Sequence, residues 1–447
     1  MEVDVILYLA EYKGQDIYNL AKKIFPYCRS ITGEGVRRTF ADLKEYIEWN
    51  SGVTFRVFEI PSGTPVFDWT VPKEWRIREA YIEDETGRRI VDMQESNLHV
   101  MGYSIPVDRW VELDELKQYI YTEPEQPEVI PYVTSYYKER YAFCMSDHQK
   151  KSLASGKYHM YIDSELFDGV LNYAEAVIPG ETEQEIFFST YICHPSMANN
   201  ECSGPALAAE LIRFVADMKR RKYTYRFIFI PETIGSISYM STEDHLAHMK
   251  ATMLAGFNLS CVGDDRDYSI VETRYADTLA DRVLKNVLRY QTAHYSTYSF
   301  LKRGSDERQY NAPGIDLPVV CYSRSKFGEY PEYHTSADNM GLVSPAGFQG
   351  SYEVMTQVIQ ALEANEKYQM MVLGEPQLGK RGLYPTVSQK GSYDAVKCMT
   401  DFIAYADGKN DLIDISNIIK VPVYGLISII DKLHGERLVS IKKEELY

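Results

Sequence analysis

The sequence predicts an α/β protein whose mostly parallel sheet carries helices on both faces. The first observation is that apolar runs, each about the length of one strand, recur after residue 150. The second is that stretches with helical periodicity separate these runs. Strands that alternate with amphipathic helices favour parallel pairing and a sheet covered on both sides. The runs that we expect to form buried strands are Ile186–Cys193, Tyr223–Ile230, Met253–Val262 and Leu317–Tyr322.

The expected helices place apolar residues three or four positions apart, which is the spacing of one helix face. Residues 17–50 are predicted to form two such helices, with a loop at residues 30–35 between them. The later helices are marked by Leu207, Leu211 and Val215, then by Leu279, Val283 and Val287, and finally by Phe348, Tyr352, Met355, Ile359 and Leu362.

The chain is long enough for more than one domain. Short β-type runs before residue 150 alternate with turns that contain proline or glycine, which predicts a small inserted β-rich domain. Glu123–Pro131, with three prolines and three glutamates, is predicted to be a linker or a return crossing. Near the C-terminus three helical stretches precede a short strand, the order of a winged helix-turn-helix. We therefore predict an α/β domain at 1–55 and 150–365, an inserted domain at 56–149 and a winged-helix domain at 370–447.

The net charge of −16 argues against nucleic acid as the main partner, because phosphate binding needs a basic surface. Residues 371–447 hold ten basic and ten acidic side chains, and the expected recognition helix, Val423–Leu433, carries Lys432 as its one base. A homo-oligomer contact or a protein partner is therefore favoured over DNA binding and transcriptional regulation. The apolar runs are shorter than the roughly 20 residues that span a bilayer. Without a signal-peptide pattern and with cysteines that indicate reduced thiols, the expected location is the cytoplasm, with no membrane contact.

His194 is the residue around which the chemistry is organised. It follows the apolar run that ends at Cys193, and a short polar turn with Asn200 and Glu201 leads into a helix that begins at Ser203. In open α/β sheets, ligand crevices lie at such strand ends. The sequence therefore predicts that His194 faces a binding crevice.

Three further polar motifs follow expected strands or precede expected helices: Pro231–Ser236, Gly304–Tyr310 and Tyr330–Asn339. Together with His194 they suggest metal-assisted hydrolysis, in which imidazoles hold zinc and a carboxylate acts as the general base. His194 and His334 would be ligands, and Glu232 the base. Asp306 or Asp338 would orient an imidazole from behind. The alternatives are that Glu232 only caps the next helix, and that Asp306 and Arg308 form a simple ion pair.

These motifs resemble those of the zinc aminopeptidase superfamily, which also contains the glutaminyl cyclases. The closer resemblance is to a bacterial group of aminopeptidase-like proteins with an inserted β domain and a C-terminal winged helix, associated with surface-polysaccharide gene clusters. The strings that carry it are Phe25–Gly33, Gly304–Tyr310 and Tyr330–Ser336.

The resemblance implies that His194 and His334 are zinc ligands and that Glu232 is the general base. It places Asn200 at the metal-bridging aspartate and Thr233 at a carboxylate that binds a second zinc, so the chain departs from the pattern at both positions. Asn258 stands loosely where another ligand aspartate would be. A dinuclear site needs anionic ligands, so we expect at most one zinc, with Asn200, Glu232 or Asp306 completing its shell.

The resulting hypothesis is a zinc-dependent aminopeptidase or amidohydrolase that cleaves an amide or peptide bond of a small substrate, with a sugar-linked compound as one candidate. Arg308 and Arg324 would grip a substrate carboxylate, and Tyr333 would line the pocket. The alternative is a catalytically degraded descendant that binds a ligand or regulates a partner while keeping the peptidase fold. Hydrolysis is the predicted reaction, and cyclisation is the other reaction that the sequence leaves open.

Overall fold

The computed structural model describes residues 11–242, 244–383 and 392–442, which divide into two compact units. The larger unit comprises Tyr12–Thr278 and Ser296–Tyr352, and holds every candidate site residue. The smaller comprises Leu279–Tyr295 and the described residues from Glu353 onward.

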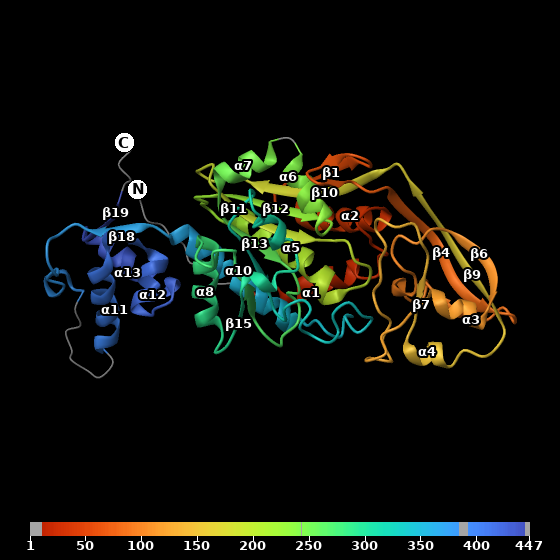
Figure 1. The fold of residues 1–447 in the computed structure, drawn as a ribbon. Coiled ribbons are helices and arrows are strands. Elements are labelled where there is room, and N and C mark those ends of the chain that lie inside the picture. The colour runs from red at the N-terminus through yellow and green to blue at the C-terminus, as the bar shows by residue number, and fades with distance from the viewer. Residues whose placement is uncertain (1–10, 243, 384–391, 443–447) are drawn as a thin grey trace. The chain divides into compact units, whose positions relative to one another are not determined.

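An eight-stranded sheet forms the centre of the larger unit (Figure 1). Its four middle strands are parallel. On one side two further strands are added antiparallel, and on the other side one strand is antiparallel to the middle four and the edge strand runs parallel to it. In spatial order the strands are β1 (Phe55–Pro61), β10 (Val170–Ile178), β12 (Thr224–Ile230), β11 (Glu185–Tyr191), β13 (Met253–Leu259), β16 (Val319–Ser323), β14 (Ser269–Val271) and β15 (Ser296–Tyr298).

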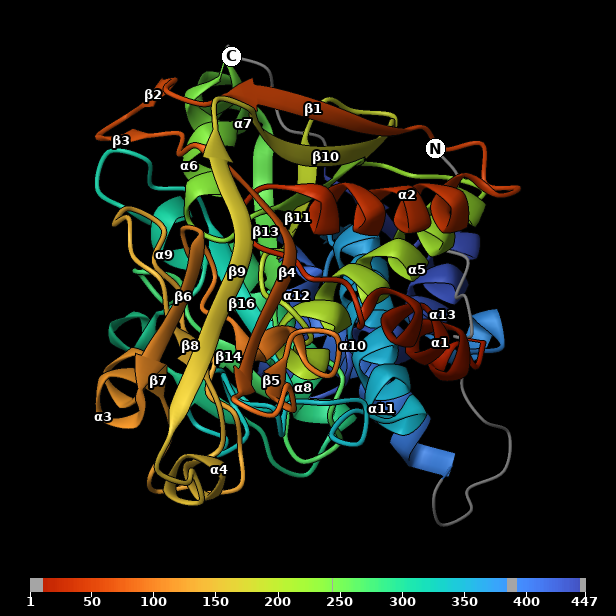
Figure 2. The ribbon, with the colours of Figure 1, turned by 90° about the vertical axis from the view of Figure 1, so that its right-hand side faces the viewer.

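Helices cover both faces of this sheet (Figure 2). On β11, Phe188 stacks between Phe227 and Phe257 of the neighbouring strands, whereas Phe187 points the other way and meets Tyr310. The helices on the Phe188 face are α1 (Gly14–Ile24), α2 (Glu34–Glu48) and α5 (Ser203–Asp217), and those on the Phe187 face are α6 (Ile234–Ser241), α7 (His245–Thr252) and α9 (Glu307–Tyr310). The predicted α/β class, with helices on both faces, is confirmed.

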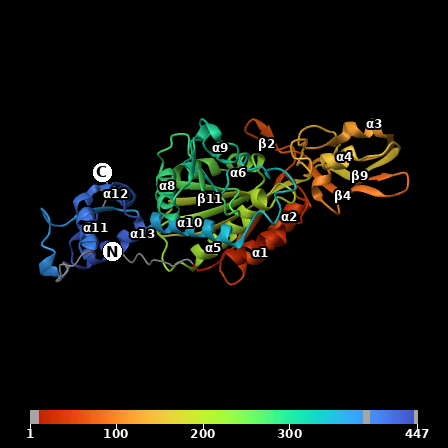
Figure 3. The same ribbon diagram turned by 90° about the horizontal axis from the view of Figure 1, so that it is seen from below.

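The inserted part is built on a four-stranded antiparallel sheet (Figure 3). Its strands in spatial order are β5 (Arg89–Asp92), β4 (Glu74–Asp84), β9 (Lys157–Phe167) and β6 (Val107–Glu112). Shorter elements beside it are α3 (Leu113–Leu116), β7 (Ile120–Tyr121), β8 (Phe143–Cys144) and α4 (Asp147–Lys151). The hairpin of β2 (Pro65–Val66) and β3 (Trp69–Thr70) instead lies against α6.

The sheets divide the chain differently from the predicted limits at 55/56 and 149/150. Strand β1 pairs with β10 in the central sheet, because Phe55 packs against Phe40 and Phe229 of the main core. Strand β9, which lies after residue 149, pairs with β4 in the inserted sheet. Alternating short strands mark a β-rich region in the sequence, but they do not show which sheet each strand joins.

The smaller unit contains the winged helix-turn-helix, which confirms that part of the predicted fold. A three-stranded antiparallel sheet in the order β18-β17-β19 joins three helices. The elements are α8 (Leu279–Gln291), the end of α10 (Pro345–Ala364), β17 (Lys367–Met370), α11 (Ser392–Tyr405), β18 (Asp407–Asp411), α12 (Leu412–Ile419), α13 (Val423–Gly435) and β19 (Val439–Ile441). Among the described residues no single helix has the length and apolarity to cross a membrane, and α12 with α13 meets that test only as a pair bent by 111°.

Candidate active site

His194 lies just beyond the C-terminal end of β11, in the turn that leads to α5. Residues Ala198–Cys202 form a short π-helical turn, an irregularity that often accompanies functional sites. Helix α5 can then begin directly over the sheet because Gly204 has no side chain: a Cβ there would lie 2.2 Å from Thr190 Oγ1. His194 is 4% exposed, and so is held inside the protein at a strand end.

Glu201, rather than Asp306 or Asp338, orients the imidazole of His194. Nδ1 of His194 is bonded to the Glu201 carboxylate, whose second oxygen accepts the Cys193 N–H at 2.7 Å. Burial alone would lower the pKa of His194, but the neighbouring Glu201 carboxylate outweighs burial and raises it. The bond to Nδ1 leaves Nε2 facing Glu232, whose carboxylate oxygen is 3.9 Å away. A histidine that binds a metal through one ring nitrogen usually donates a hydrogen bond from the other ring nitrogen to a carboxylate or a carbonyl group.

Glu232 is presented by a strained turn directly after β12. Thr233 has φ of 65° and ψ of −71°, and Ile234 N–H donates to the Glu232 carbonyl at 2.7 Å, which closes a γ-turn of the rare positive-φ type. The Asp306 carboxylate accepts the Thr233 N–H at 2.8 Å, and Arg308 donates to the Thr233 hydroxyl. These contacts stabilise a conformation that costs about 1–3 kcal/mol in a β-branched residue. Burial raises the pKa of Glu232 to about 8, which suits a general base.

His334 lies opposite His194, with 5.0 Å between the ring centroids. Its own φ is 58°, and the ring of Tyr333 stacks on it at 3.8 Å between centroids. Burial and the nearby His194 lower the pKa of His334 to about 3, so the ring is neutral at physiological pH. Within the described part of the chain, its buried Nε2 has no hydrogen-bond partner.

The nitrogen and oxygen donors at the site are of the types that zinc accepts, although His334 is not part of the group of ligand atoms that lie closest together. A neutral imidazole nitrogen such as His334 Nε2 is a zinc ligand. Like that nitrogen, the buried Asn200 Oδ1 has no hydrogen-bond partner among the described residues. The ligand atoms of Cys193, His194 and Glu232 lie within 4.8 Å of one another. Burial holds the pKa of the Cys193 thiol well above its usual range, so that residue is a neutral packing group.

Asp338 and Asp306 support the backbone of the site instead of an imidazole. Asp338 accepts the N–H groups of Asn199 and Asn200 at 2.6 and 3.0 Å, and fixes the π-helical turn. Asp306 accepts from Thr233 and from the Ser236 hydroxyl at 2.7 Å. Burial raises the pKa of Asp338 to about 6 and that of Asp306 to about 7.

Arg324 is not brought to the site as a substrate contact. Its guanidinium donates to the carbonyls of Asp267 and Gly347 and lies 3.8 Å from the centre of the Tyr268 ring, so it links loops. Asn258, the loose match to a ligand aspartate, instead donates to the Ser305 hydroxyl at 2.9 Å.

Sequence reasoning missed two groups besides Glu201. Arg29, within the motif Phe25–Gly33, donates to the His194 carbonyl at 3.0 Å and is 2% exposed, so it fixes the turn from behind. Tyr132 comes from the inserted part and touches both imidazoles, His194 at 4.7 Å and His334 at 5.2 Å between centroids. Arg29 could have been recognised in the sequence, because it is a basic residue inside an otherwise apolar junction between a helix and a loop.

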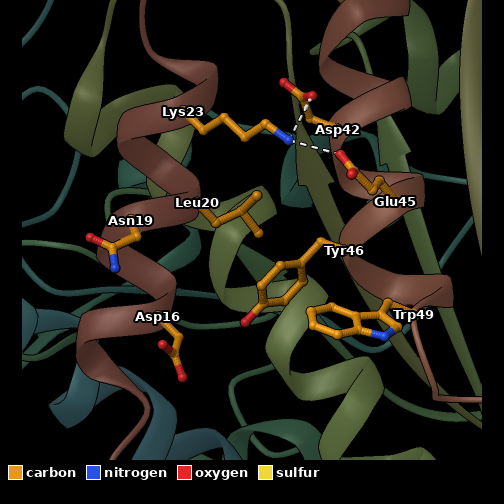
Figure 4. Close-up of a pocket in the computed structure, with 8 residues that line it drawn as sticks. All are labelled: Asp16, Asn19, Leu20, Lys23, Asp42, Glu45, Tyr46 and Trp49. Atoms are coloured by element: carbon orange, nitrogen blue, oxygen red, sulfur yellow. Dashed lines mark hydrogen bonds and ion pairs between the residues drawn. The ribbon is translucent and has the colours of Figure 1, made fainter.

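Surface hollows lie elsewhere in the larger unit. One, of about 300 Å³, opens between α1 and α2, where Lys23 reaches Asp42 and Glu45 at 3.1 and 2.9 Å (Figure 4). Another, of about 550 Å³, lies along β1, β10 and β12 near Arg56. Neither includes a candidate site residue.

We expect Glu201→Gln to weaken zinc binding by about 10- to 100-fold, the range found for residues that support a ligand from behind. Glutamine keeps an oxygen for His194 Nδ1 but removes the charge that raises the imidazole pKa. Competition with a chromogenic chelator measures the affinity, and exposed Glu183→Gln is the control. Unchanged affinity would show that the Glu201 charge has no part in holding the ion.

The fold belongs to a known class, the zinc aminopeptidase fold. A zinc aminopeptidase from Bacillus subtilis aligns with a TM-score of 0.58 at 12% identity, covering 80% of this chain and 96% of that one. An aminopeptidase from Aneurinibacillus sp. strain AM-1 aligns at 0.51 and 13%, covering 78% and 93%. At these identities the likeness concerns the fold alone.

The family is defined more closely. Residues 18–365 match the family described as Domain of unknown function (DUF4910), to which the chain belongs, and residues 366–441 match a winged helix-turn-helix family. A Clostridium acetobutylicum protein, provisionally named for polysaccharide biosynthesis and an aminopeptidase-like domain, is 42% identical over 418 residues, 93% of this chain and 94% of that protein. A crystal structure from the same organism, of a provisionally assigned peptidase, has a TM-score of 0.89 at 39% identity and covers 96% and 97%. The resemblance inferred from the motifs is confirmed.

Proposed function

We propose that the chain is a zinc-dependent hydrolase of the aminopeptidase type, which cleaves an amide or peptide bond of a small substrate in polysaccharide biosynthesis. The observation that carries the proposal is the pair of facing imidazoles, His194 and His334, beside the carboxylate of Glu232. The two histidines would hold one ion, with Asn200 Oδ1 completing the shell. The proposal keeps the cytoplasmic location expected from the sequence.

Zinc, when bound, lowers the pKa of water and polarises a carbonyl group. Glu232 takes the proton from the attacking water and returns it to the leaving nitrogen. Its raised pKa, about 8, lets it accept and release a proton near neutrality. Glu201 keeps the proton on His194 Nδ1, so that Nε2 presents its lone pair. The γ-turn at Thr233 keeps the Glu232 carboxylate directed at the same place.

One ion is favoured over two by the groups at positions 200 and 233. Asn200 supplies an amide oxygen without charge, and Thr233 Oγ1 already accepts from Arg308. Two dications at short range need anionic ligands to offset their repulsion, and these positions offer none. The same lack of anionic ligands at positions 200 and 233 also favours the alternative function, a ligand-binding or regulatory protein that has lost catalysis.

The winged helix is proposed to act in docking. Its region carries as many acidic as basic residues, which suits a protein partner or a second copy better than DNA.

The proposed function is tested by metal analysis of protein purified without chelator. We expect about one zinc per chain, together with hydrolysis of aminoacyl amides. Both should be lost in His334→Ala, because the variant removes one of two imidazoles, and both should persist in His294→Ala, a change at an exposed histidine. A metal-free, inert wild type would leave the ligand-binding alternative.

A further inference from the structure

A segment of the inserted part runs alongside the loop that carries His334. We call residues 126–136 the return segment. Tyr132 N–H donates to the His334 carbonyl at 2.8 Å. Ser336 N–H donates to the Ile130 carbonyl, and Ile130 N–H donates to the Ser336 hydroxyl, both at 2.9 Å. The two stretches therefore pair like short antiparallel strands, across some two hundred residues of sequence.

The ring of Tyr132 reaches further, to the imidazoles themselves. It stands edge-to-face against His194 and His334, with interplanar angles of 65° and 82°. Tyr333 stacks on His334 at an interplanar angle of 16°. The positive φ of His334 is unfavourable for a residue with a side chain. The residue is nevertheless held in place by the rings of Tyr132 and Tyr333 and by the hydrogen bond that its carbonyl accepts from Tyr132.

Tyr132 is itself anchored in the inserted part. Its hydroxyl lies 2.7 Å from the hydroxyl of Tyr136. The Tyr136 ring meets the edge of Tyr103, which is 2% exposed and stacks on Trp75. A continuous series of ring contacts, with one hydrogen bond between the hydroxyls of Tyr132 and Tyr136, therefore links the packed base of the insert to the two histidines.

We propose that Tyr132 is a positioning residue of the active site, through which the inserted part holds the His334 loop in place. The ring and the backbone N–H restrict the loop before any ligand arrives. Preorganised ligands bind a metal more tightly, because less conformational entropy is lost on binding. The consequence for zinc rests on the proposed function, whereas the hold on the loop does not.

The hold on the loop is tested on metal-free full-length protein by amide hydrogen exchange. In Tyr132→Ala the Ser336 amide should exchange about tenfold or more faster, because the paired stretches open locally. Tyr132→Phe keeps the ring against the imidazoles but loses the hydroxyl bond to Tyr136, so it should accelerate exchange less than the alanine variant does. Tyr137→Ala, at the exposed neighbouring tyrosine, is the control. Wild-type exchange in Tyr132→Ala, or equal acceleration in Tyr132→Phe, would overturn the proposal. Tyr132→Leu replaces the alanine variant if that variant does not fold.

The consequence for the metal is tested by zinc affinity. We expect Tyr132→Ala to bind zinc about 10- to 100-fold more weakly, the range for groups that orient a ligand, and Tyr132→Phe, which keeps the ring but loses the bond to Tyr136, to lose less affinity. Equal affinity of the alanine variant would contradict the positioning role. If the wild type binds no zinc, the proposed function fails, and the exchange experiment still decides whether Tyr132 holds the loop.

Discussion

Glu232→Gln is expected to lower kcat for amide hydrolysis by about 10²- to 10⁴-fold, the usual contribution of a general base. Glutamine has almost the same shape but cannot accept the proton of the attacking water. The turn that presents the side chain depends on Thr233, Asp306 and Arg308, all of which remain. KM and zinc content should therefore change little, and steady-state kinetics with metal analysis measure both.

The pH profile separates the loss of a base from a distorted site. Glu232 works as the carboxylate, so the wild-type rate should fall as pH falls through the pKa of this group, which burial raises. The glutamine variant should lack that decline. Glu183→Gln, at an exposed position, should behave as the wild type. Full activity of Glu232→Gln would remove the residue from the mechanism.

The strand-end residues could be predicted because their signals are local. His194 and Glu232 each follow an apolar run of strand length, and parallel neighbouring strands bring their C-terminal ends together. His334 was singled out by its polar loop before a helix and by the motif resemblance, but nothing near it in sequence indicates that its loop meets β11. The departure at Asn200 was also visible, because a change of residue type needs no structure to detect.

The supporting groups could not be predicted because they depend on tertiary geometry. The role of Glu201 at His194 follows from the π-helical turn, which has no clear sequence signature. Tyr132 lies 62 residues before His194 and reaches it only through the pairing of the return segment. Arg324 was assigned by its place in the sequence, and its contacts to backbone carbonyls emerge only on folding.

Arg226→Met is expected to lower the free energy of unfolding by about 3–5 kcal/mol, the cost of breaking a buried ion pair on one side. Arg226 of β12 pairs with Glu185 of β11 and Glu175 of β10, each at 2.8 Å. The side chains of Glu185 and Glu175 are 3% and 12% exposed. Without the guanidinium, the carboxylates of Glu175 and Glu185, on the two strands that flank β12, lose their shared cation where little water can solvate them.

The loss of stability in Arg226→Met should change with pH in a definite direction. Burial would raise the pKa of Glu185, but Arg226 outweighs burial and lowers it. The pair therefore stabilises the wild type above the ordinary glutamate pKa, and this stabilisation is lost as pH falls through the depressed folded pKa. In Arg226→Met, Glu185 keeps His248 at 2.9 Å but loses the stronger of the two groups that lower its pKa, so the deficit should shrink on acidification. Urea unfolding at pH 7 and pH 5 measures both effects.

Arg220→Met is the matched control, because Arg220 pairs with Glu181 at the surface, where the side chains are 41% and 50% exposed. Such a pair contributes about 1 kcal/mol or less. Adding Glu175→Gln and Glu185→Gln to Arg226→Met should recover part of the loss, since neutral amides cost less to bury than unpaired charges. If Arg226→Met and Arg220→Met unfold at the same urea concentration, this ion-pair cluster does not stabilise the edge of the sheet. The chain would then depend on apolar packing alone to hold β10, β11 and β12 in the register that places His194 beside Glu232.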